Sequence, residues 1–125
     1  MYQNLELFRT AGAMAQHAGA RQAVTARNIA NADTPGYQAM QMPSFADAFD
    51  GHRQSIHQTR ADHLLTEARH RERLMSLADT EPSPNGNSVS IEEEMMRAVA
   101  ISREHNRSLA IYRHGMTVLR AALGR

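Results

Sequence analysis

Small and apolar residues recur at alternating spacings of three and four at both ends of the chain. This repeat runs through residues 4–31 and again through residues 91–125. It places one stripe along a helix and is the pattern of a coiled-coil contact, so it limits the fold to paired long helices. The N-helix stripe comprises Leu5, Phe8, Gly12, Ala15, Gly19, Gln22, Ala26 and Ile29. The C-helix stripe comprises Ile91, Met95, Ala98, Ser102, His105, Leu109, Tyr112, Met116, Leu119 and Leu123.

Glycines interrupt the middle of the N-helix stripe. A glycine inside a helix costs about 1 kcal/mol relative to alanine, so Gly12 and Gly19 weaken the helix when it stands alone. A gain must offset that cost, and close approach by another backbone is the gain that small residues allow. We therefore expect another helix to pack on this stripe.

Capping residues set the expected ends of both helices. Asn4 is the expected N-cap of the first helix, and Ser90 with Glu93 forms an S-x-x-E capping box for the second. Gly124 is expected to end the second helix. At 1.5 Å per residue the two helices reach roughly 42 and 50 Å, which is a good match for a side-by-side pair.

The first helix is stopped abruptly by Thr34-Pro35-Gly36. The residue before a proline leaves the helical region, proline cannot continue a helix, and glycine completes a type I or II turn. Asn28 and Asn31 lie one helical turn apart just before this stop, with amides that can bond local backbone or a neighbouring chain. We expect a junction made of Asn28, Asn31, Thr34, Pro35, Gly36 and Tyr37.

Residues 38–90 carry repeated turn signals and form an irregular middle segment. Ser44 is placed to cap a short helix over residues 45–49, residues 62–78 are helical by composition, and residues 79–90 are expected to form an exposed loop. The predicted fold is mainly α: N- and C-terminal helices paired as a coiled-coil-like hairpin, around a middle segment with short helical or extended pieces. Residues 1–37, 38–90 and 91–125 are its three parts, and the two terminal parts form one structural domain. Two helices this poor in large apolar residues bury only part of each other, so neighbouring subunits are expected to supply the missing contacts.

Composition excludes several function classes. The chain has 125 residues, no cysteine and a net charge of +1 without a basic stripe, which argues against disulfides, thiolate metal sites and nucleic-acid binding. No apolar run is long enough to span a membrane, and no catalytic motif or phosphate loop is present, so neither an enzyme nor a cofactor is expected. His63, Glu67 and His70 would share a helix face with spacing that suits zinc, but their Arg- and Glu-rich surroundings favour a solvated face. His105 is interpreted as an interface residue.

The literal string N-I-A-N-A-D-T-P-G-Y over residues 28–37 resembles the N-terminal signature of bacterial flagellar rod and hook proteins. The resemblance extends to residues 1–8 and 17–22 at the start of the chain. It also extends to residues 84–89 and 91–95 before and within the C-terminal helix. It covers roughly residues 1–42 and 84–125, and its two ends are most similar to proximal rod proteins.

The resemblance implies a structural subunit of the flagellar basal-body rod, assembled through its terminal helices into a helical tube that transmits torque. It also implies export from the cytoplasm through the flagellar type III apparatus without a cleaved signal peptide. The implied partners are other rod proteins, the rod–ring adaptor and the inner-membrane ring. Phe45 and Phe49 are similar to the short element by which such subunits engage the export gate, although the same spacing also suits packing on the helix pair.

The alternative is a stand-alone helical-hairpin binding module, such as a secretion chaperone or a small secreted protein. Such a module would fold as a stable monomer or dimer, whereas a rod subunit by itself is expected to be only partly ordered.

Overall fold

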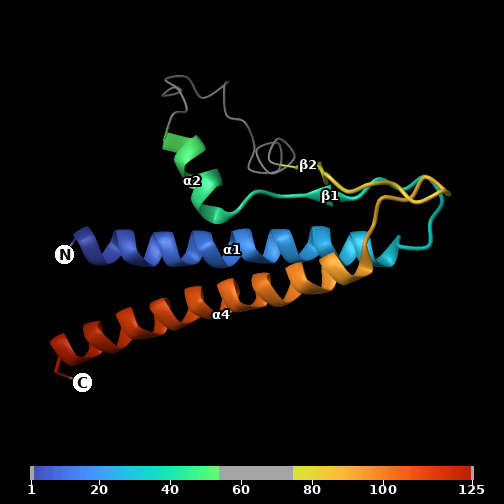
Figure 1. Cartoon of the computed structure of the whole chain (residues 1–125). Helices are drawn as coiled ribbons and strands as arrows, with labels where there is room; N and C mark the ends of the chain where they lie inside the picture. Colours follow the sequence, from blue (N-terminus) through green and yellow to red (C-terminus); the bar gives the residue numbers. More distant parts are fainter. Residues whose placement is uncertain (1, 54–74, 125) are drawn as a thin grey trace, which may run out of the picture.

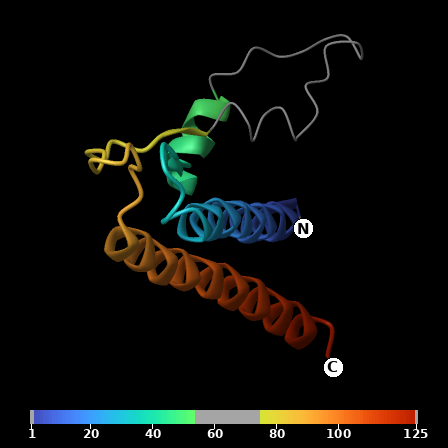
Figure 2. The same ribbon diagram turned by 90° about the vertical axis from the view of Figure 1, so that its right-hand side faces the viewer.

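Two long helices dominate the computed structural model, which describes residues 2–53 and 75–124. α1 spans Tyr2–Ala30 and α4 spans Ile91–Ala122. The two helices run antiparallel and pack against each other, with both chain termini at the same end of the pair (Figure 1). Their axes diverge toward the termini, as the end-on view in Figure 2 also shows. The predicted hairpin of terminal helices is confirmed.

The ends of α4 form as the sequence indicates. The Ser90 hydroxyl accepts a hydrogen bond from the Glu93 backbone N–H at 3.4 Å, which is the first half of the capping box. The Glu93 carboxylate lies 3.1 Å from the Arg97 guanidinium. Gly124 follows the helix with a φ of 73°, a conformation that glycine adopts without strain.

The start of α1 differs from the prediction. The helix begins at Tyr2, so Asn4 lies inside its first turn and cannot be its N-cap. The first amides of a helix can be satisfied by water in place of a side-chain cap.

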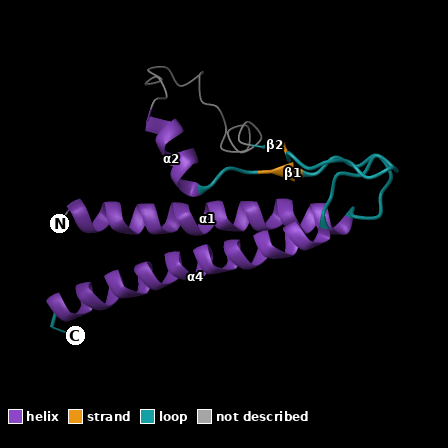
Figure 3. Cartoon of the chain, viewed as in Figure 1, coloured by secondary structure: helices purple, strands orange, loops and turns teal. Residues whose placement is uncertain are grey.

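The described parts of the middle segment that flank residues 54–74 lie along the outer side of α1 (Figure 3). β1 (Met40–Gln41) pairs antiparallel with β2 (Ser76–Leu77), and α2 (Phe45–Arg53) follows β1. The Ser44 hydroxyl accepts a hydrogen bond from the Asp47 N–H at 3.3 Å, so the predicted short helix begins where expected and extends further. The helix predicted over residues 62–78 is wrong at 76–77, which form β2, and its residues 62–74 lie outside the described residues.

The contact between α1 and α4 uses small residues and is displaced from the predicted stripes. The buried residues of α4 repeat every seven positions, and they are Glu94, Ile101, Ser108 and Gly115. Buried residues of α1 repeat in the same way at Ala11, Ala18 and Thr25. Both sets lie one position before the predicted stripes, which corresponds to a rotation of about 100° around each helix. The fully buried positions therefore differ from the predicted stripes, although Phe8 and Tyr112, one from each stripe, meet edge-on.

Most of the predicted stripe residues consequently face outward. On α4, Met95 is 60% and Leu123 is 78% exposed, and on α1 the side chains from Gly19 to Ile29 in the stripe are exposed as well. At Gly115 of α4 the missing side chain leaves room for the Phe8 ring of α1. As surfaces for contact with other subunits, the two stripes remain predictions.

Candidate assembly site at the helix junction

The stop after α1 is a tight turn at residues 34–37. The Tyr37 N–H donates to the Thr34 carbonyl at 3.2 Å, and Gly36 has a φ of 71°. A proline at the second position and a positive φ at the third are the features of a type II turn. The turn sends the chain back along α1 and brings Tyr37 onto the end of the helix.

Asn28 connects the end of α1 to the start of β1. Its side chain is completely buried. Its Nδ2 donates to the Met40 carbonyl at 2.7 Å, while its Oδ1 accepts from the Met40 N–H at 3.1 Å and from the Tyr37 hydroxyl at 3.2 Å. The amide thus pairs with the Met40 backbone as a neighbouring strand would. A buried amide satisfied on both sides fixes where β1 crosses the helix.

Asn31 acts more locally. Its Nδ2 donates to the Arg27 carbonyl at 2.8 Å, and its Oδ1 accepts from the Thr34 hydroxyl at 3.3 Å. These bonds satisfy one of the last carbonyls of α1 and link it to the first residue of the turn. All six predicted junction residues therefore lie together at this end of the molecule.

Asn87 completes the junction and was missed by the sequence analysis. It is 2% exposed, and its Nδ2 lies 2.8–2.9 Å from the carbonyl oxygens of Asn31, Ala32 and Thr34. Its Oδ1 accepts from the Val89 N–H at 2.7 Å. One side chain from the segment before α4 thus binds three carbonyls of the turn that follows α1. The available signal was its place directly after the Pro84-Asn85-Gly86 turn.

A second tight turn packs against the first. The Gly86 N–H donates to the Ser83 carbonyl at 2.8 Å, and the Gly36 N–H donates to the Asn85 carbonyl at 3.0 Å. A Cβ at Gly86 would lie 3.3 Å from the Gly36 Cα, so the two glycine turns are in backbone contact. Any side chain at Gly86 would push the turns apart.

Ser88 ties the same loop to the chain leading into β1. Its hydroxyl accepts from the Ala39 N–H at 2.8 Å, and its own N–H donates to the Tyr37 carbonyl at 3.0 Å. The loop at residues 79–90, predicted to be exposed, therefore has a buried anchor at Asn87 and exposed residues before it. The junction is a rigid corner built from backbone and amide groups.

Phe45 and Phe49 lie together on α2. Their rings are stacked with centroids 5.6 Å apart, and Phe45 also meets the His17 ring of α1 edge-on at 5.7 Å. Phe49 remains 44% exposed. One ring therefore packs on the helix pair and the other is accessible, and engagement of an export gate by the pair remains a prediction.

Of the histidines that the sequence analysis singles out, the structure describes His105 but not His63 or His70. His105 is half-buried on α4, and its Nδ1 has no hydrogen-bond partner within the described part of the chain. His63, Glu67 and His70 lie outside the described residues. Over residues 2–53 and 75–124, no three side chains of metal-binding type come together.

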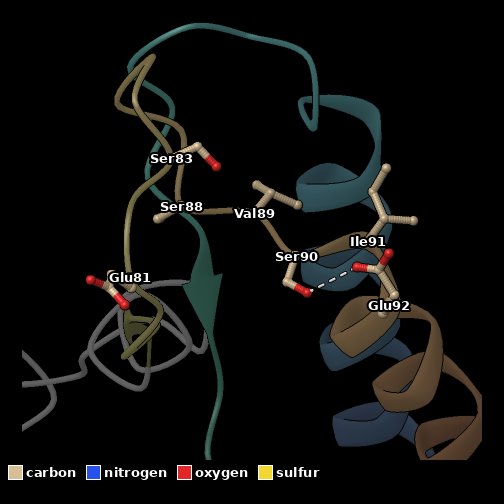
Figure 4. Close-up of a pocket in the computed structure, with 7 residues that line it drawn as sticks. All are labelled: Glu81, Ser83, Ser88, Val89, Ser90, Ile91 and Glu92. Atoms are coloured by element: carbon tan, nitrogen blue, oxygen red, sulfur yellow. Dashed lines mark hydrogen bonds between the residues drawn. The ribbon is translucent and has the colours of Figure 1, made fainter.

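A hollow beside the start of α4 is lined by Glu81, Ser83 and residues 88–92. Figure 4 shows the Glu81 and Glu92 carboxylates on opposite sides of it, so they do not converge on one ligand position. Among the helices that the structure describes, none combines the length and apolarity needed to cross a membrane.

Comparison with known proteins points to the same part of the chain. Residues 8–38 match the model of the family described as "Flagella basal body rod protein". The match spans most of α1 and the whole type II turn, and it includes all six predicted junction residues. No curated protein matches the chain.

Proposed function

We propose that the chain is a flagellar rod protein, because residues 8–38 match that family's model, and that it is a structural subunit of the proximal rod. Its two ends are similar to those of the proximal rod protein FlgB. In this proposal it performs no catalysis and holds no cofactor. It transmits torque as one unit of a helical tube, through stiffness and interlocking contacts.

The observation that carries the proposal is the combination of a closed junction with an open helix pair. The junction satisfies its buried amides within the chain, at Asn28 and Asn87. The helices instead leave large apolar side chains exposed along α4, among them Met95, Met96 and Leu123. A surface of this kind is typical of protein–protein contact. Head-to-tail contacts, in which two different surfaces of the same subunit meet without closing a ring, produce helical assemblies.

The finer elements of the proposal concern delivery and neighbours. The subunit leaves the cytoplasm through the flagellar type III export apparatus without a cleaved signal peptide, and the exposed Phe49 with Phe45 engages the export gate. Within the basal body its neighbours are other rod proteins, the rod–ring adaptor and the inner-membrane ring. The absence of cysteine from the sequence suits a chain that must stay uncrosslinked in transit.

Cryo-tomography of basal bodies in cells that lack this gene tests the proposal. The expected result is inner-membrane rings and an export gate with no rod above them. A complete rod in those cells would contradict the proposal and favour the stand-alone helical-hairpin module. Restoration of the rod by the wild-type gene on a plasmid is the control.

A further inference from the structure

The turn before α4 contains the single Asn-Gly pair of the chain, Asn85-Gly86. An asparagine that precedes a glycine can react within the chain, because glycine has no Cβ to hinder approach of its backbone nitrogen to the asparagine side chain. Both residues are exposed, so water reaches them. The pair therefore carries a reactive group whose fate depends on the conformation of the turn.

The folded turn holds the pair in a geometry that blocks this reaction. The Gly86 N–H donates to the Ser83 carbonyl at 2.8 Å, which places Pro84 and Asn85 at the centre of the turn. Asn85 has no positive φ, so the turn is type I rather than type II, and the ψ of Asn85 is then about 0°. Attack would require the Gly86 nitrogen to lie eclipsed with the Asn85 Cβ, and this ψ turns the nitrogen away. The hydrogen bond to Ser83 also occupies the N–H that would have to lose its proton.

The junction holds the turn in that geometry. The Asn85 carbonyl accepts from the Gly36 N–H at 3.0 Å, and the Asn85 Oδ1 accepts from the Asn87 N–H at 3.0 Å. The buried Asn87 amide in turn binds the turn that follows α1. Rotation of the Asn85–Gly86 peptide would break these contacts, so the turn can rearrange only when the junction opens.

We infer that Asn85 is a site of spontaneous deamidation, which the closed junction suppresses and an open chain undergoes. In the open chain the Gly86 nitrogen gives its proton to solvent and attacks the Asn85 Cγ. The new C–N bond closes a succinimide ring, and the side-chain nitrogen takes up a proton and leaves as ammonia. One water molecule then opens the ring at either carbonyl and leaves aspartate or isoaspartate at position 85. This inference concerns the chemical state of the chain and stands independently of the proposed rod function.

The two products affect the junction differently. Aspartate keeps the course of the backbone and an oxygen in the place of the Asn85 Oδ1, so it changes only the charge of an exposed group. Isoaspartate leads the main chain through Cβ and Cγ and leaves the former carbonyl, which accepts from the Gly36 N–H, as a free carboxylate. The backbone between positions 85 and 86 is then one atom longer. Isoaspartate formed in an open chain therefore hinders later closing of the junction.

Timed incubation with peptide mapping tests the inference on the full chain, in buffer and in concentrated guanidinium chloride at the same mildly alkaline pH. Trypsin releases residues 74–97 as one peptide that contains both Asn85 and Asn87. Mass spectrometry of its fragments shows which amide has become an acid, and samples taken at time zero give the background from digestion. In denaturant Asn85 should react faster than Asn87, which precedes a serine. In buffer Asn85 should react roughly tenfold more slowly, or slower still, because the junction must first open.

Asn87→Ala tests whether the junction is the cause of the protection, because it removes the amide anchor and leaves the reacting pair intact. In buffer this variant should deamidate at Asn85 about fivefold faster than the wild type or more. Asn106→Ala, at an exposed position of α4, is the matched control and should react at the wild-type rate. The rate of each variant in denaturant is its own reference, so a change in the reactivity of the open chain is separated from a change in opening.

Equal rates for the wild type in buffer and in denaturant would overturn suppression by the fold. A rate at Asn85 no greater than that at Asn87 in denaturant would overturn the site, and an unchanged rate in Asn87→Ala would overturn the role of the junction. The effect of the product has its own measurement. Chains modified in denaturant and returned to buffer, with their isoaspartate measured by an isoaspartyl methyltransferase, should unfold at a lower guanidinium concentration than chains that carry Asn85→Asp. Equal midpoints would overturn the effect assigned to isoaspartate.

Discussion

The junction and the helix pair differ in which side chains they bury. At the junction, Asn28 and Asn87 are almost fully buried and their amides are bonded to backbone groups of the same chain. Along the helices, the buried residues are mostly small, and many large apolar ones such as Met96, at 74% exposure, stay outside. The first region is complete within one chain, and the second is not. The difference indicates that the corner defines the shape of the subunit while the helices hold its contacts with others.

The largest expected effect comes from removing the amide that closes the junction. Asn87→Ala leaves the carbonyls of Asn31, Ala32 and Thr34 without that donor in a buried site, and losses of this kind cost about 1–3 kcal/mol. We expect the upper end of that range in the free energy of unfolding, measured by urea denaturation of the purified chain. Asn106→Ala, at an exposed position of α4, should change it by less than about 0.5 kcal/mol. Equal effects at the two positions would show that the corner is not the stable region.

A smaller effect is expected where the helices themselves touch. Gly115→Leu places a large side chain against Phe8 and should lower the free energy of unfolding by roughly 1–2 kcal/mol through overpacking. Gly12→Leu meets open space and removes a helix glycine, so it should leave the monomer as stable or stabilise it by up to about 1 kcal/mol. Thermal unfolding of both variants, followed by circular dichroism, compares them. Similar destabilisation by both would mean that the stripe at Gly12 is occupied within the chain.

The smallest effect is a pH dependence at the contact between α1 and α2. Burial, and then the charge of Arg21, lower the pKa of His17 below its ordinary value of 6.5, while Glu104 acts weakly in the opposite direction. The unfolded chain therefore takes up the proton first, so this contribution to stability is present above pH 6.5 and is lost as the pH falls through the lowered pKa. Urea denaturation across this range should show the loss, and His17→Leu should reduce it.

His114→Leu, which removes a histidine from an exposed position of α4, is the control for that experiment. An unchanged pH dependence in His17→Leu would assign the acid sensitivity to other groups. In the folded chain the guanidinium of Arg21 also lies 2.6 Å from the Glu104 carboxylate. Both variants should therefore keep Arg21 and Glu104, so that this ion pair is the same in each.

Local chemistry made the ends of several elements predictable, although not the start of α1. Ser44 and Ser90 cap the helices that they were expected to cap, and residues 34–37 form the expected turn, because these features depend on groups only three residues apart. Periodicity alone could not predict which face of each helix makes the contact. Both helices carry two neighbouring stripes, and the one that the structure buries on α4 includes Ser108 and Gly115. Asn87 could not be assigned from sequence because its acceptors lie 53 to 56 positions away.

The distance along the chain between the two helices has a consequence for the order of folding. α1 and α4 are separated by the whole stretch from residue 31 to residue 90, so the pair cannot form until that loop closes. Closing such a loop costs several kcal/mol of entropy, and a lone helix with interior glycines is marginal in water. Suppose that the chain passes through a narrow opening N-terminus first. The residues of α1 then have no α4 to pack against until the last quarter of the polypeptide has followed. The chain can then change from a flexible, unpaired state to the rigid helix pair only when its C-terminal end arrives.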